Sequence, residues 1–147
     1  LSGLYGILKP LDLIQAYRLE MGISLQNSRG KNLYQFWNEK IPNALNEEMR
    51  NRHDQVIINL ASNEYFKATQ PKKLDADVIT PIFKDAKNGR FKVISFFAKK
   101  ARGLMANYII KNRVENPDQL RAFDCAGYQF SDSLSDKYDW VFTREEQ

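Results

Sequence analysis

Residues 77–113, "DVITPIFKDAKNGRFKVISFFAKKARGLMANYIIKNR", decide the fold because they join a hairpin signal to a helix signal. Two apolar segments, 77–85 and 90–98, flank Lys87-Asn88-Gly89, and Asn-Gly between apolar runs is a strong indication of a β-hairpin. Pro81 indicates a bulge or an edge position in the first strand. The second strand is apolar on both faces, which predicts a central strand covered on both sides.

The helix that follows carries cations where they are electrostatically unfavourable. An apolar stripe from Ala98 to Ile109 predicts one buried face, and Lys99, Arg102 and Gly103 fall on the opposite side. With the helix start placed at these residues, its dipole repels the cations. Either they are simply solvated, or a phosphate at the free N–H groups completes the charge balance. Gly103 and the small Ala106 would let an anion approach the backbone closely.

Charge is distributed unevenly along the chain. The formal net charge is only +4, but residues 84–113 hold nine Lys or Arg and one acid, a net +8. Residues 114–147 hold eight acids and three bases, a net −5. A basic segment beside an acidic tail indicates an anionic partner for the basic segment, and the alternative is a surface merely solvated by lysine.

Outside this stretch the pattern alternates between strands and helices. Alternation over 16–22 predicts a strand, with Arg18 and Glu20 on one face. An apolar stripe predicts a helix over 31–51, kinked or split at Pro42. The remaining predicted elements are a buried strand at 55–61, a short helix at 63–68 capped by Ser62, and strands at 127–130 and 139–145. We therefore predict an α+β fold with a mixed, mostly antiparallel sheet and flanking helices.

Four polar or aromatic residues lie at or just beyond the carboxyl end of the buried strand at 55–61. Open sheets often place functional sites at the carboxyl ends of their strands, so these residues are candidates for a site. Glu64 and Tyr65 would suit general acid–base chemistry, although a cap and a core ring are the more common roles of such a pair. The four residues are Asn59, Ser62, Glu64 and Tyr65.

Length and composition restrict the class of protein. A chain of 147 residues, 43% hydrophobic, predicts a single globular domain, and it lacks the apolar run of about 20 residues that a membrane helix needs. Cys125 is the sole cysteine, which fits a reducing cytoplasm. His53 is the sole histidine and is expected at the surface. With one residue of each type, a zinc or histidine-dependent iron site is not expected, and we predict no cofactor.

Five segments of the chain carry a resemblance to a known family. They are 1–22, "LYQFW" at 33–37, "INLASNEYFK" at 58–67, "NGRFKVISFFAKKARGLM" at 88–105 and "GYQF" at 127–130. These segments resemble the bacterial YaaA family of peroxide-stress proteins. They lie in family order along the whole chain and match only the carboxyl-terminal half or so of the family pattern. A segment like "SPAKTLD" from the amino-terminal part is absent, and Leu1 replaces an initial methionine, so we expect a chain truncated at its N-terminus.

The resemblance implies a cytoplasmic protein that protects cells from hydrogen peroxide, lowers unincorporated iron and limits oxidative DNA damage. It also implies a mixed α/β fold with a positively charged cleft, binding to DNA, and a helix-hairpin-helix element whose hairpin could be "GLYG" at 3–6. Carried over by position, the predicted DNA- and phosphate-binding residues are Lys9, Arg18, Lys99, Lys100, Arg102 and Gly103, with Glu20, Asn59, Ser62, Glu64 and Tyr65 as the cleft wall.

We therefore expect a protein that binds duplex or distorted DNA independently of sequence, and that is not an enzyme. The alternative is an enzyme that acts on a nucleotide or nucleobase in the same cleft. In that case Glu20 or Glu64 would be the acid or base, and Lys99 with Arg102 would hold the phosphate. A third reading is a protein that handles iron through carboxylates alone.

Overall fold

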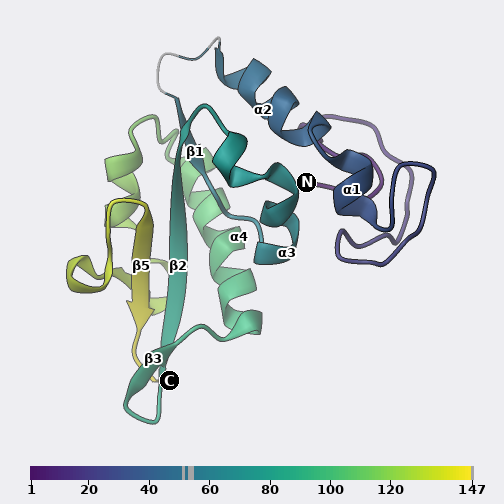
Figure 1. Ribbon diagram of the computed structural model, residues 1–147. Coiled ribbons are helices and arrows are strands. Elements are labelled where there is room, and N and C mark those ends of the chain that lie inside the picture. The colour runs from purple at the N-terminus through teal and green to yellow at the C-terminus, as the bar shows by residue number, and fades with distance from the viewer. Residues whose placement is uncertain (51, 53–54, 147) are drawn as a thin grey trace. The chain divides into compact units, whose positions relative to one another are not determined.

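The computed structural model describes residues 1–50, 52 and 55–146, and the chain forms two compact units (Figure 1). The first unit comprises Leu1–Gln55 and Ala61–Ala76, and the second comprises Val56–Leu60 and Asp77–Gln147. That the chain makes up a single domain stays a prediction. The predicted surface position of His53 lies outside the described residues.

A mixed sheet organises the second unit. Its strands are β1 (Val56–Ile58), β2 (Asp77–Lys87), β3 (Arg90–Lys92), β4 (Gln129–Phe130) and β5 (Asp139–Arg144). The order is β1-β2-β5-β4, with β3 paired to β2. The α+β class and the mixed sheet are confirmed. Within the described residues two pairings are parallel (β1 with β2, β2 with β5) and two are antiparallel, so antiparallel pairing does not predominate.

The predicted hairpin forms, but its second strand is short and exposed. Asn88 and Gly89 have positive φ values of 54° and 70°, as the tight two-residue turn between β2 and β3 requires. The three residues of β3 are exposed and pair with β2. The prediction of a central, covered second strand is wrong, because the chain leaves the sheet after Lys92 and enters a helix at Ser95.

Pro81 lies in the central strand at a local gap in its pairing. The Thr80 amide donates to Tyr138 O (2.7 Å), so the neighbouring residue's backbone nitrogen faces the other edge of β2. On that edge the pairing with β1 ends at Ile79, and the pairing with β3 begins at Asp85. A missing N–H at Pro81 therefore breaks no ladder hydrogen bond, as the predicted edge position requires.

Helix α4 (Ser95–Lys111) runs alongside β2, and it begins at the end of the unit that carries the β2–β3 hairpin (Figure 1). Ala98, Ala101 and Met105 are buried against Ile79 and Phe83, which confirms the predicted apolar face. The helix begins earlier than predicted, and the Ala98 amide already donates to Ile94 O. The second unit also contains the 3₁₀ turns η3 (Pro117–Ala122), η4 (Cys125–Gly127) and η5 (Asp132–Leu134).

A buried ion pair joins β2 to β5. Arg144 Nε donates to Asp85 Oδ1 (2.7 Å), and the Tyr128 hydroxyl donates to Asp85 Oδ2 (3.0 Å). The Arg144 guanidinium lies between the rings of Phe97 and Tyr128, 4.8 and 4.5 Å from their centroids. The carboxylate of Asp85 is therefore neutralised inside the unit.

Helices and loops build the first unit. Its helices are α1 (Leu33–Trp37), α2 (Lys40–Arg50) and α3 (Asn63–Phe66), followed by the 3₁₀ turns η1 (Lys67–Thr69) and η2 (Pro71–Lys73). Met21, Leu33, Ile41 and Ala68 form its buried core. The predicted helix over 31–51 is split at Asn38, where φ is 34°. Pro42 lies in the first turn of α2, where its missing N–H is not needed.

Two further predictions in the first unit have different outcomes. The strand predicted over 16–22 does not form, because the segment finds no neighbouring strand within the described residues. Burial follows the alternation only in part, since Met21 is buried and Leu19 half-buried, but Tyr17 is exposed like Arg18 and Glu20. Ser62 is the N-cap residue of α3, as predicted, although its hydroxyl makes no capping hydrogen bond.

Candidate functional site

Three of the four cations of α4 lie in its second turn. Because the helix begins at Ser95, Lys99, Lys100 and Arg102 follow the first turn instead of forming it. The field of a helix terminus fades within the first turn, so the predicted conflict between these cations and the dipole is wrong. No anion is therefore needed to balance these cations against the helix dipole, and an anionic partner is indicated by their exposed charge alone.

The same cations are free of carboxylate partners. Lys99 and Lys100 are exposed and Arg102 is half-buried, and within the described part of the chain none of the three pairs with an acid. The Lys100 ammonium lies 4.6 Å from the centroid of the Phe96 ring, which holds it over an exposed aromatic surface. These charges are available to an external anion.

Gly103 leaves the helix backbone open beside these cations. A Cβ atom built at this position meets no atom within 4 Å, and the residue is exposed. Glycine in a helix interior costs about 1 kcal/mol relative to alanine. Nothing in the second unit occupies the space that the missing side chain leaves.

The hairpin adds cations that sequence reasoning counted but did not single out. Lys87, Arg90 and Lys92 are exposed on β2 and β3, and only two residues separate β3 from α4. Asp85 is the one acid of residues 84–113, and its charge is satisfied internally by Arg144. The outward-facing charge of this segment is therefore wholly positive, which a charge count along the sequence could not establish.

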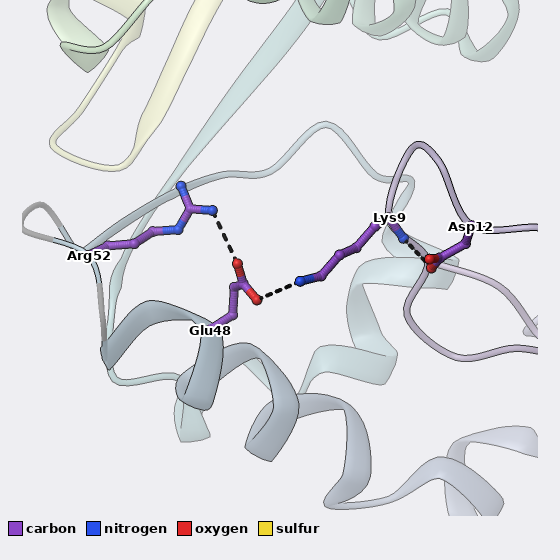
Figure 2. A network of polar contacts seen from close by, with 4 residues as sticks. All are labelled: Lys9, Asp12, Glu48 and Arg52. Atoms are coloured by element: carbon purple, nitrogen blue, oxygen red, sulfur yellow. Dashed lines mark hydrogen bonds and ion pairs between the residues drawn. The ribbon is translucent and has the colours of Figure 1, made fainter.

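Lys9 is already engaged by an acid of the same unit. Its ammonium contacts Glu48 Oε2 at 3.1 Å, and Arg52 contacts the other oxygen of the same carboxylate at 3.3 Å (Figure 2). Hydrogen bonds from Lys9 and then Arg52 hold the pKa of Glu48 below its usual value. The Lys9 amide donates to Asp12 Oδ2 at 2.7 Å, which fixes the loop locally.

The residues predicted as a cleft wall have structural contacts. Asn59 is buried, and its backbone N–H donates to Ile79 O at 2.8 Å. Glu64 Oε1 accepts a hydrogen bond from the Gly22 amide at 2.8 Å, while the Glu64 carbonyl accepts one from the Tyr34 hydroxyl at 2.9 Å. Tyr65 packs against the core of the first unit.

The predicted site residues are divided between the two units. Lys99, Lys100, Arg102, Gly103 and Asn59 belong to the second, and the others belong to the first. The basic cleft that would unite them therefore stays a prediction.

The "GLYG" segment forms a tight turn without flanking helices. Ser2 and Gly6 pair across it, with N···O distances of 2.7 and 2.9 Å, and Gly6 has a φ of 76°. Within the described residues the first helix begins at Leu33, so this turn is not the hairpin of a helix-hairpin-helix element. The segment that follows it, residues 7–32, holds turns and irregular backbone but no helix.

Two kinds of feature are absent from the part of the chain that the structure describes. No group of three or more His, Cys, Asp or Glu side chains there is arranged to hold a metal ion. Among the described helices, none combines the length and apolar content that a membrane crossing requires.

Comparison with known proteins gives one family. Residues 1–134 match the family model described as peroxide stress protein YaaA. A UPF0246 protein of Colwellia psychrerythraea (strain 34H / ATCC BAA-681) is 62% identical over 146 residues, which is 99% of this chain. UPF0246 proteins of Aliivibrio fischeri strains MJ11 and ES114 are 59% and 58% identical over all 147 residues. The chain spans 57% of the length of each of these relatives.

Proposed function

This chain belongs to the family of the peroxide stress protein YaaA, and we propose that within that response it binds DNA through its basic surface. Binding would help to limit oxidative damage to DNA, together with a lowering of free intracellular iron, in the cytoplasm. Duplex or distorted DNA would be bound independently of sequence, through phosphates instead of base edges.

The observation that carries the proposal is the positive charge of residues 84–113, whose cations pair with no carboxylate among the described residues. Lys99, Lys100 and Arg102 project from α4, and three hairpin cations lie at the end of the unit where α4 begins, while Asp85 is neutralised internally. Cations that have no internal partner can neutralise phosphates without first breaking an ion pair. Each neutralised phosphate releases condensed counterions, so the affinity must fall steeply with salt.

The candidates differ in how well the structure supports them. Arg18 is exposed and, within the described residues, contacts no acid, so it can join the phosphate contacts. Lys9 would have to leave Glu48 to do so, and its contribution should be smaller.

The test is fluorescence anisotropy of a labelled duplex over a salt series. The Lys99→Glu/Arg102→Glu variant should bind at least tenfold more weakly and lose about two from the slope of log K against log salt. Arg50→Glu/Lys72→Glu is the matched control, since it changes the net charge equally at exposed residues of the first unit. Circular dichroism must show that all three proteins are folded.

If the folded wild-type chain shows no salt-dependent binding, the proposal fails. An equal loss of affinity in both variants would also contradict it, because the effect would then come from net charge and not from α4. The Glu20→Gln variant distinguishes the DNA-binding proposal from the enzymatic alternative. It should leave DNA binding intact in a protein that only binds, and it should abolish turnover if Glu20 is a catalytic acid or base. The carboxylate of Glu64 already accepts the Gly22 amide, which makes Glu20 the sharper test.

A further inference from the structure

A pocket in the first unit has the size and the lining of a binding site for a small ligand. Its volume is about 390 Å³, and it lies among the loop before α1, α1 itself and η1. Sites for small molecules commonly span about 300–1,000 Å³. The lining residues used below are Arg29, Tyr34, Gln35, Asn38, Lys67 and Gln70.

Two cations line this pocket without an acidic partner. The Arg29 guanidinium lies 5.0 Å from the centroid of the Phe36 ring, and the Lys67 ammonium lies 4.9 Å from that of Tyr34. Both rings belong to α1, so one short helix supports both charges. Within the described residues neither cation pairs with a carboxylate, and none lines the pocket. The pocket is therefore positively charged and uncompensated.

Side-chain amides supply hydrogen-bonding groups beside the cations. Gln70 Nε2 donates to Asn38 O at 2.7 Å, and Gln35 Oε1 accepts the Lys31 amide at 2.6 Å. These bonds fix the amide orientations and, among the described contacts, leave Gln35 Nε2 and Asn38 Nδ2 as donors and Gln70 Oε1 as an acceptor. A ligand with both acceptors and donors in its body would match this set.

Strained backbone occurs at two of the residues that line the pocket. Asn38 has a φ of 34° and Gln70 a φ of 48°, and these two residues are hydrogen-bonded to each other. Non-glycine residues with positive φ are uncommon and costly, and they cluster where a binding site fixes the backbone. Gly30 adds a tight packing point, since a Cβ there would lie 2.5 Å from that of Gln35.

We propose that this pocket binds a phosphate monoester of mononucleotide size. Arg29 and Lys67 would hold the phosphate, because a guanidinium binds it with two parallel hydrogen bonds and an ammonium as a point charge. The amides of Gln35, Asn38 and Gln70 would hydrogen-bond the body of the ligand. Two sources share this chemistry, a free nucleotide and the phosphorylated end of a DNA strand.

The pocket shares no residue with the proposed DNA-binding surface. Arg29 and Lys67 belong to the first unit, whereas Lys99 and Arg102 belong to the second. The inference therefore does not depend on the anisotropy experiment, and either proposal can fail while the other stands.

Isothermal titration calorimetry of the 147-residue chain with AMP, adenosine and inorganic phosphate tests it. We expect AMP to bind, adenosine to bind at least tenfold more weakly, and phosphate to compete with AMP. Arg29→Gln/Lys67→Gln should weaken AMP binding at least tenfold. Arg50→Gln/Lys72→Gln removes the same charge from exposed residues outside the pocket and should change binding less than twofold.

Three results would overturn the proposal: a folded chain that does not bind AMP, equal affinity for AMP and adenosine, or an equal loss in both double variants. A short single strand with a 5′-phosphate, compared with the same strand bearing a 5′-hydroxyl, identifies the source. If the phosphorylated strand alone displaces AMP, the ligand is a strand end. If neither strand displaces it, the ligand is a free nucleotide.

Discussion

Asp85 is a charged residue held in the interior by two partners of different kinds. Its side chain is 6% exposed and that of Arg144 is 13% exposed, and the Tyr128 hydroxyl completes the set. A buried ion pair of this sort adds little net stability over apolar packing, but removing one member leaves the other as an unpaired buried charge, which is strongly destabilising. Arg144 also fills the space between two aromatic rings, so its loss removes packing as well.

Replacing Arg144 with methionine should therefore lower the free energy of unfolding by about 3–5 kcal/mol, since Asp85 would remain buried and unpaired. Asp85→Leu/Arg144→Met should be less destabilised than the single variant, because no stranded charge remains. Urea denaturation measures both. Lys87→Met, at an exposed position, should stay within about 0.5 kcal/mol of wild type. A loss below 1 kcal/mol for Arg144→Met would show that Asp85 is solvated.

Ionisation of the Tyr128 phenol should lower the free energy of unfolding at high pH. Burial, and then the hydrogen bond to Asp85, raise the pKa of Tyr128 from 10.0 to about 12. A raised pKa means that the folded state holds the proton more tightly than the unfolded state. Its contribution is complete below pH 10 and is lost as the pH rises toward 12, at about 1.4 kcal/mol per unit.

Urea denaturation between pH 9 and pH 11.5 should show this loss, and Tyr128→Phe should show a shallower slope because it has no proton to lose. The comparison removes the shared effect of the other tyrosines and lysines. Parallel slopes for the two proteins would mean that Tyr128 ionises in the folded state near its ordinary pKa.

At the scale of the element, α4 shows what a pattern can and cannot fix. Its buried face was predictable, because Ala98, Ala101 and Met105 recur at helical spacing. Its start was not, because Phe96 and Phe97 are apolar and suit a covered strand as well as a helix turn. In the structure both rings are exposed, although apolar side chains are expected to be buried. Their apolar character therefore did not indicate where the strand ends and the helix begins. The electrostatic reason for expecting an anion at the helix start depended on that boundary, whereas phosphate binding by Lys99 and Arg102 stays a prediction.

Gly103→Ala should stabilise the second unit by about 1 kcal/mol, because the new Cβ meets nothing within 4 Å and alanine favours the helix. The same variant should weaken DNA binding if a phosphate approaches this face. Thermal denaturation and anisotropy measure the two effects. Gly3→Ala is the contrasting control, since its Cβ would lie 2.5 Å from Leu19 O and should destabilise the first unit. A destabilised Gly103→Ala would show that the space is filled.

The strand expected over 16–22 shows the opposite limit. Alternation predicted the exposure of Arg18 and Glu20 correctly but not that of Tyr17, and pairing depends on a partner strand that no local pattern specifies. The position of Pro81 depends similarly on where β1 stops and β3 begins along the far edge of β2. Local chemistry did suffice at Asn88-Gly89, since the turn needs two positive φ values and these residues tolerate them.

At the scale of the whole molecule, the two units have unequal cores. The second buries a cluster of aromatic rings, and Phe83 contacts Phe123, Tyr128 and Phe142 at centroid distances of 5.2–5.9 Å. The core of the first consists of Met21, Leu33, Ile41 and Ala68, and its residues 1–32 contain no described helix. A smaller core beside long loops opens at lower free energy.

Native-state hydrogen exchange should therefore find greater protection in β2 and α4 than in α1 and α2. The expected difference is at least 1 kcal/mol in opening free energy, since apolar burial scales at roughly 25 cal/mol per Å². Equal protection throughout would mean that the two units unfold as one.

The candidate site was predictable only where its charged residues lie close together along the sequence. The basic run of 84–113 was visible in the sequence, but the pairing of Asp85 with Arg144 joins residues 59 positions apart. Lys9 and Glu48 are 39 positions apart, so the occupation of Lys9 was equally hidden. The pocket of Arg29 and Lys67 escaped prediction because neither residue stands in a charged cluster along the chain.

The path of the chain between the units has a consequence for dissecting the protein. Strand β1 belongs to the second unit, yet segments of the first precede and follow it, so the chain crosses after Gln55, after Leu60 and again after Ala76. One protease cut releases neither unit, and neither can be transplanted as an uninterrupted stretch of gene. The segments of the two units alternate along the sequence, so the two units must be expressed and exchanged together.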